Sequence, residues 1–285
     1  MPWDRLTEWG MSFVSYDLSI SVVALERLNP ELCQSEAVET FDFLIRIVDA
    51  FTRIVNNFKT ALKGFRYKFK RSELKAYHES HVLAINRFLK QRTFDPSLSV
   101  PIPSGMKVSY IQAVNTIDPI YTQLDIGSTI DTLLDYFNTV SKSGDFTSTK
   151  DITKKISKLR MDQVETTLRT VFTADKTLEV KLGSVIASFD ELISVDQHIL
   201  KYESIFQHVD VFCTKLDKIE ATIDVLIKDI EKTASPDRTM IQDLYDLVHT
   251  AGVQLDIYGV LLDSFQRIEH NFVILLRRVV DTTRI

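Results

Sequence analysis

The chain has 285 residues and a formal net charge of −5, with 45% apolar and 26% charged residues, a composition typical of a folded soluble protein. Its 8 glycines and 7 prolines are few for this length, which excludes a fold made of many short strands and favours long helices. No apolar run approaches the length of a membrane span, and the N-terminus lacks the pattern of a signal peptide. We therefore expect a soluble protein, cytoplasmic or assembled into a particle built inside the cell.

The N-terminal part of the chain carries a candidate docking segment. Trp3 and Trp9 are the only tryptophans, and tryptophan is enriched at interface hot spots. The stretch Ser15–Val22 then alternates apolar and polar residues. This period predicts a strand that would add to another chain's sheet edge, whereas the apolar residues that follow Val22 predict the start of a helix, so both interpretations stay open. Folding of the segment back onto its own bundle is the alternative to docking. The candidate partner-binding residues here are Trp3, Trp9, Tyr16, Leu18 and Ile20.

A long helix is predicted next, because apolar residues recur alternately three and four positions apart. The seam is rich in phenylalanine, which favours a packed bundle over a slim two-stranded coil. Its members are Phe41, Leu44, Val48, Phe51, Val55, Phe58, Leu62, Phe65 and Phe69. A second helix is predicted over residues 72–89.

The end of this seam coincides with a basic stretch, Lys59–Lys75, which has seven basic residues and one acidic residue. Cations interleaved with aromatics are typical of nucleic-acid binding. Phe65 and Phe69 belong to the seam, however, so the cations are expected to form an outer face of the helix. That face would be solvated, paired within the chain, or bound to the acidic surface of a protein partner. The candidate partner-binding cations are Lys63, Arg66, Lys70 and Arg71.

A proline-rich joint is predicted at residues 93–109, since a helix cannot cross Pro96, Pro101 and Pro103. Beyond it, Asp118 and Pro119 predict a helix start, with Asp as N-cap, that runs to about Val140. A further helix of about twenty residues is predicted between Ile152 and Val171 from its apolar spacing. The predicted organisation is an N-terminal helical bundle (residues 1–92), the joint (93–109), a middle helical segment (110–174) and a C-terminal helical hairpin (175–285).

The C-terminal hairpin is the most detailed prediction. One helical seam runs from Leu178 to Ile230 with a phase slip near Tyr202, and a second runs from Ile241 to Val279. Between them, Ser235 and Pro236 predict a helix break and a new start. If the chain reverses there, residues whose numbers sum to about 470 or 471 should face each other in an antiparallel coiled coil. The expected layers run from Ile230 with Ile241, through Ile223 with Val248 and Phe212 with Tyr258, to Ile205 with Phe265.

Motifs for catalysis and metal binding are missing from the sequence. There is no glycine-rich phosphate loop, nucleophile elbow, His-Glu-x-x-His or Cys-x-x-Cys. His78 and His81 are spaced as half of a metal site, and no second pair completes it. Cys33 and Cys213 are expected to be buried, reduced thiols. We therefore expect no enzyme activity, no cofactor, no bound metal and no small-molecule substrate.

The sequence thus predicts an all-α protein with a helical bundle followed by a long antiparallel coiled-coil hairpin. The function we expect is that of a structural subunit of a larger protein complex, docking through long helices to other copies or other subunits. A viral or phage particle is one such complex, although no motif marks it. The alternative is a nucleic-acid-binding accessory protein that uses Lys59–Lys75.

Overall fold

The computed structural model describes residues 13–28, 40–70, 93–102, 105–143, 149–156, 158–172, 178–201, 203–230 and 238–282. Most of these residues are helical, which confirms the predicted all-α class in its coarse form. The described helices are α1 (Phe13–Glu26), α3 (Thr40–Lys70), α5 (Tyr110–Leu124), α6 (Ile126–Ser143), α7 (Thr149–Lys155), α8 (Met161–Val171), α9 (Phe189–Lys201), α10 (Glu203–Ile230) and α11 (Arg238–Thr282). A small antiparallel sheet pairs β1 (Ser99–Ile102) with β2 (Leu178–Lys181).

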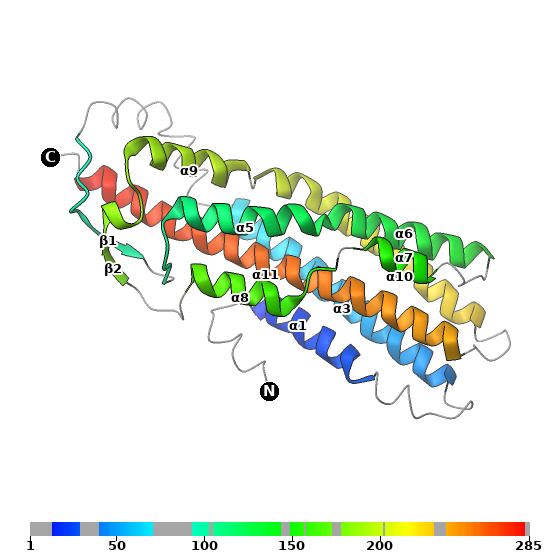
Figure 1. Ribbon diagram of the computed structural model, residues 1–285. Coiled ribbons are helices and arrows are strands. Elements are labelled where there is room, and N and C mark those ends of the chain that lie inside the picture. Colours follow the sequence, from blue (N-terminus) through cyan, green and yellow to red (C-terminus); the bar gives the residue numbers. More distant parts are fainter. Residues whose placement is uncertain are drawn as a thin grey trace.

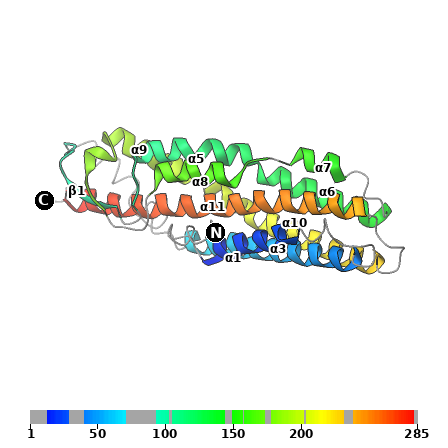
Figure 2. The same ribbon diagram turned by 60° about the horizontal axis from the view of Figure 1, so that its bottom comes forward.

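Helix α11 is the axis of an elongated bundle (Figure 1). Its 45 residues span roughly 67 Å at about 1.5 Å per residue. Helices α5, α7 and α8 lie on one side of it, and α1 and α3 lie on the other (Figure 2). Between residues 251 and 262 every side chain is buried except that of Val253, which is partly buried. A helix that is apolar all round requires neighbours on every side, and α11 has them.

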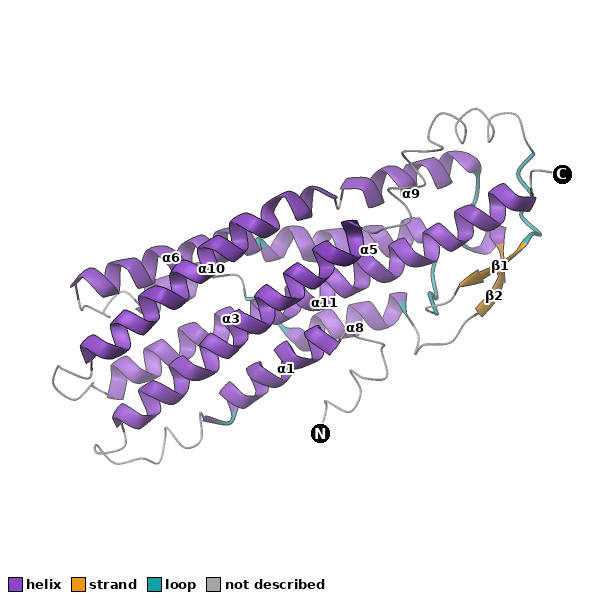
Figure 3. Cartoon of the chain, turned by 180° about the vertical axis from the view of Figure 1, so that it is seen from behind, coloured by secondary structure: helices purple, strands orange, loops and turns teal. Residues whose placement is uncertain are grey.

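The predicted two-helix coiled coil is not confirmed among the described residues. The chain reverses direction between α10 and α11, but along its described length α10 packs against α6 and α3, and α11 packs mainly against α3, α1, α7 and α5 (Figure 3). The matched layers, such as Ile223 with Val248, are therefore wrong as a register. The physical reason is that both seams bury against several helices instead of against each other.

The predicted Phe-rich helix is confirmed as α3. Its apolar stripe is buried from Phe43 to Phe65, and Phe51, Ile54 and Phe58 are 1% exposed or less. The stretch Ser15–Val22 lies in helix α1, so the strand interpretation is wrong and the helix interpretation is right. The helix predicted over residues 72–89 lies outside the described residues.

Helix boundaries in the middle of the chain differ from the prediction. Helix α5 begins at Tyr110, eight residues before Asp118, because Ser109 and Gln112 form a reciprocal capping box. Pro119 lies inside α5, and the chain breaks instead at Asp125, whose φ of 37° is left-handed. A tight turn of this kind separates α5 from α6 without a proline.

Two other predicted helices are broken. The segment from Ile152 to Val171 forms α7 and α8, which are separated near Leu159. The seam from Leu178 begins as strand β2 and a short 3-10 turn, and becomes helical only at Phe189. The predicted phase slip near Tyr202 coincides with the change from α9 to α10.

One core joins elements from the N-terminal, middle and C-terminal parts of the chain. Val100 and Ile102 of β1 belong to it, so this part of the proline-rich joint packs onto the bundle. The division at residues 92, 109 and 174 itself stays a prediction. Among the described residues, no helix is long and apolar enough to cross a membrane.

Candidate functional site

The first residue of the basic stretch, Lys59, is paired within the chain. It lies on α3, is 8% exposed, and its Nζ donates to Asp217 Oδ1 at 2.8 Å and to Glu220 Oε2, both on α10. Burial lowers the pKa of Lys59, but the hydrogen bonds to the two carboxylates outweigh it and leave the pKa raised. The bond from Lys59 holds the pKa of Asp217 below its ordinary value. Lys59 is therefore a charged connection between α3 and α10, and it is not available to a phosphate.

The other cations of the basic stretch are placed less completely. Lys63 is exposed on α3, near enough to α10 to lower the pKa of Asp217. Arg66 and Lys70 are in the last turns of α3, but their side chains lie outside the described residues, as does all of Arg71. The basic stretch is thus partly neutralised by α10 at the end that the structure describes.

Cys213 lies beside this charged connection as a free, buried thiol. Burial is the main cause that raises its pKa, with the nearby Asp217 and Asp210 acting in the same direction and Lys63 opposing them. A thiol with a raised pKa is protonated at neutral pH and is a poor nucleophile. The expectation of a buried, reduced thiol is confirmed for Cys213, and Cys33 lies outside the described residues.

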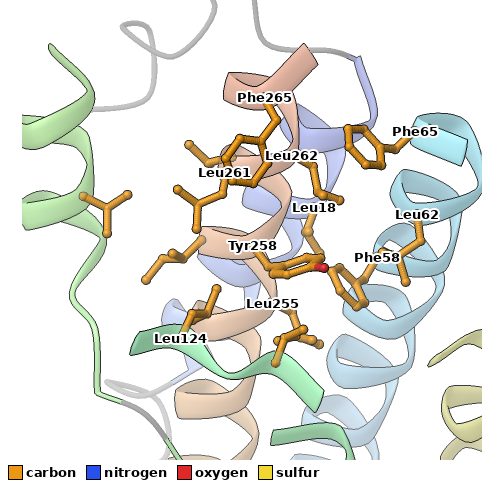
Figure 4. Packing of buried hydrophobic residues seen from close by; sticks show 14 of the residues in the cluster. Leu18, Phe58, Leu62, Phe65, Leu124, Leu255, Tyr258, Leu261, Leu262 and Phe265 are labelled. Atoms are coloured by element: carbon orange, nitrogen blue, oxygen red, sulfur yellow. The ribbon is translucent and has the colours of Figure 1, made fainter. Parts of the chain in front are cut away.

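The candidate docking residues of the N-terminus separate into two kinds. Leu18 is fully buried beside Tyr258 and Leu262 (Figure 4), so it is a core residue and cannot meet a partner in this fold. Ile20 is 47% exposed on the outer side of α1. A helix separates these residues by about 200°, whereas the strand pattern would have put them on one face. Trp3 and Trp9 lie outside the described residues, and so does the side chain of Tyr16.

Three large apolar side chains are exposed in the described part of the chain, one on α1 and two on α10. Among the described residues, the large hydrophobic side chains that are exposed are Ile20 on α1 and Val211 and Val225 on α10, each close to half exposed. Val211 and Val225 are two heptads apart, which places them on the same face of α10. Lys218 lies midway between them and is also exposed. The sequence prediction missed this face because it assigned α10 to a coiled coil with α11.

A polar cluster lies between α1 and the central helix. Asp256 of α11 is 1% exposed, and its Oδ1 accepts a hydrogen bond from Ser19 Oγ of α1 at 2.7 Å. Burial is the largest of the causes that raise the pKa of Asp256 to about 7. Asn57 of α3 donates to Ser21 Oγ at 2.9 Å and to the Asp17 carbonyl at 3.1 Å. Polar bonds thus join α1 to both helices beneath it.

The histidines and acidic side chains of the described residues do not form a metal-binding cluster. No group of three or more metal-binding side chains occurs among the described residues, and His78 and His81 lie outside them. Asp256 has no adjacent nucleophile other than Ser19, which is itself fully buried. The described residues offer exposed apolar and charged side chains for binding on α1 and α10.

Comparison with known proteins gives no relative: no protein family matches the chain, and no curated protein and no solved structure shows significant similarity to it.

Proposed function

We propose that the protein is a structural subunit that assembles with other protein subunits through the outer faces of its helices, in a complex such as a viral or phage particle. The observation that carries the proposal is the exposed apolar face of α10, with Val211 and Val225 on either side of Lys218. Two exposed apolar side chains on one face of a helix, two heptads apart, are a candidate contact surface for a helix of another subunit.

The shape of the bundle supports the same function. The helices packed around the 45-residue central helix present long surfaces, and such surfaces can set distances between neighbouring subunits. Binding through these surfaces needs no reacting groups. This function agrees with the role of the buried polar side chains, since Ser19 and Asp256 join α1 to α11.

The nucleic-acid alternative has less support. Protein cations bind a phosphate backbone by neutralising its phosphates, which releases the counterions of the nucleic acid. Lys59 is already paired with Asp217 and Glu220. No observation in the described residues favours this alternative. It therefore enters the test as a competing outcome.

The test is the size of the assembled protein, measured by light scattering and mass photometry across a range of concentrations. The wild type should associate, by itself or with a co-purified subunit in fixed stoichiometry. The double variant Val211→Asp/Val225→Asp should lose that association while it retains its helical circular dichroism. Thr139→Asp, on the exposed side of α6, is the matched control and should assemble normally.

Two results would contradict the proposal. One is assembly that is unchanged in the double variant. The other is a wild type that stays monomeric at all concentrations and instead binds single-stranded DNA with an affinity that falls steeply with salt.

Deletion of residues 1–22 is not a suitable test of assembly, because it would remove Leu18 and Val22 from the core.

A further inference from the structure

Helix α1 is a peripheral helix with an unusual contact to the core. It packs on α3 and α11 and on no other described helix to a comparable extent. Its apolar contacts include Leu18, Val22 and Leu25, each 2% exposed or less. Between these contacts lies the Ser19–Asp256 hydrogen bond, which places a carboxyl group in the interface.

The packing around this carboxyl is close. Gly252 lies one turn before Asp256 on α11, and a Cβ added to it would come within 3.1 Å of Ile54 Cδ1 on α3 and 3.6 Å of Val22 Cγ2 on α1. The three helices therefore meet at short distance beside Asp256. Its carboxyl is 1% exposed, so docking of α1 removes it from water.

The charged groups around Asp256 oppose its ionisation. Glu26 of α1 and Glu165 of α8 are the charged groups that act on it, and both disfavour a second negative charge. Glu165 is partly compensated by Arg169 of α8 at 3.6 Å, and Glu26 lies 3.2 Å from the imidazole of His249 of α11. Helix α3 presents the apolar Ile54 on this side. Asp256 itself has no ion pair among the described residues, and its hydrogen-bond donor is the neutral hydroxyl of Ser19.

We propose that docking of α1 onto the bundle is coupled to protonation of Asp256, so that acidification tightens α1 and ionisation of Asp256 loosens it. An ionised carboxylate in this interface would be buried without a cation, which is costly. Release of α1 returns the carboxylate to water and removes that cost. This coupling is a property of the chain by itself and does not depend on the proposed assembly function.

The direction of the pH effect follows from linkage. The pKa of Asp256 is about 7 with α1 docked and falls toward the ordinary value of about 3.9 once the group is in water. The docked state therefore binds more protons between these two values, and docking weakens as pH rises through this window, by about tenfold per pH unit over most of it. Below about pH 4 docking is strongest, and above about pH 7 the loss is complete.

Hydrogen exchange of the full-length protein measures this coupling. Protection of the α1 amides, corrected for intrinsic exchange rates, should fall by roughly 50-fold between pH 5 and pH 7. Protection of the α3 amides should change much less, because α3 stays in the bundle when α1 leaves. A carbon-13 titration of the Asp256 carboxyl should show a midpoint well above the ordinary aspartate value of about 3.9.

Matched variants separate Asp256 from other groups. Asp256→Asn keeps the size of the side chain and its ability to accept from Ser19 but cannot ionise, so α1 protection should no longer depend on pH. Asp246→Asn, exposed on α11, should behave as the wild type. His249→Gln removes the imidazole that contacts Glu26 at this interface, and the pH dependence should survive it.

Three results would overturn the proposal. The first is a pH dependence of α1 protection that persists in Asp256→Asn, which would assign it to His249 or to a general effect of charge. The second is an equal loss of protection in α1 and α3 as pH rises, which would mean that the change of pH acts on the whole bundle. The third, which remains decisive if Asp256→Asn fails to fold, is a carboxyl midpoint for Asp256 below about pH 5 in the wild type.

Discussion

Replacing Lys59 with methionine tests whether the basic stretch has an internal role. Methionine keeps the apolar stem but removes the ammonium group, which leaves Glu220 without its ion-pair partner. The side chains of Lys59 and Glu220 are 11% and 17% exposed, whereas that of Asp217 is 62% exposed. Breaking a buried pair costs about 3–5 kcal/mol and breaking an exposed one about 0–1 kcal/mol. We expect the free energy of unfolding to fall by roughly 2–3 kcal/mol, a value between these two ranges, because Lys59 and Glu220 are largely buried and Asp217 is exposed.

The loss should be visible in urea denaturation at neutral pH as a lower midpoint with an unchanged slope. Lys63→Met is the matched control on the exposed side of α3 and should change stability by less than about 0.5 kcal/mol. The double variant Lys59→Met/Glu220→Leu should recover much of the loss, because no uncompensated charge remains in the interface.

The pH range of this stabilisation follows from the two shifted groups. The pKa of Lys59 is raised, so its contribution is present below the ordinary lysine value of about 10.5 and is lost as pH rises above it. The pKa of Asp217 is lowered, so its contribution is present above its ordinary value and is lost as pH falls below it. The difference between wild type and Lys59→Met should thus be constant between about pH 5 and pH 10. A loss no larger than that of Lys63→Met, or a double variant less stable than Lys59→Met, would refute the reasoning.

Three further variants test local features of the fold by the same denaturation assay. Gly252→Leu should destabilise the protein by about 1–3 kcal/mol, because the new side chain would enter the contact with Ile54. Gly64→Ala on α3, with no atom within 4 Å of the added Cβ, should stabilise it by about 0.5–1 kcal/mol. Similar effects at both sites would contradict the packing. Ser109→Ala should cost about 1 kcal/mol by removing the cap of α5, and a neutral result would show that the capping box is unimportant. Tyr110→Phe should be neutral or stabilising by up to about 1 kcal/mol, because the buried hydroxyl of Tyr110 has no partner in the described residues; a clear loss of stability would mean that it has one.

The sequence predicts elements with one apolar stripe better than elements with several. Helix α3 has a single stripe and an outer face of charges, so its periodicity gives both its extent and its buried side. Helix α11 is buried on all sides between residues 251 and 262. A prediction that gives it one seam therefore finds one partner, whereas the structure has several. The register with α10 looked convincing because two amphipathic helices of similar period can always be aligned over a few turns. Periodicity shows that one face of a helix is buried. Which helix packs on that face depends on the arrangement of the whole bundle.

Helix ends depend on local interactions that compete over a few residues. Asp118 and Pro119 form a good helix start, but the capping box of Ser109 begins the helix earlier, and a proline within a helix is tolerated where packing compensates the missing donor. The break comes at Asp125, since aspartate is one of the few residues that adopt the left-handed conformation. Each signal was present in the sequence. Their relative strength was decided by how Tyr110 and Ile117 pack into the core.

The same distinction applies to the charged residues. An internal partner for the basic stretch was one of the interpretations that the sequence left open, and the structure supplies it for Lys59 because α10 brings Asp217 and Glu220 alongside α3. Asp256 did have a signal, since it is the only charged residue between positions 251 and 262. A lone charge in so apolar a stretch must face water, pair with an opposite charge, or lose its charge on burial. With α1 packed over it, Asp256 has no access to water, and the cost of its ionisation becomes a cost of holding α1 in place.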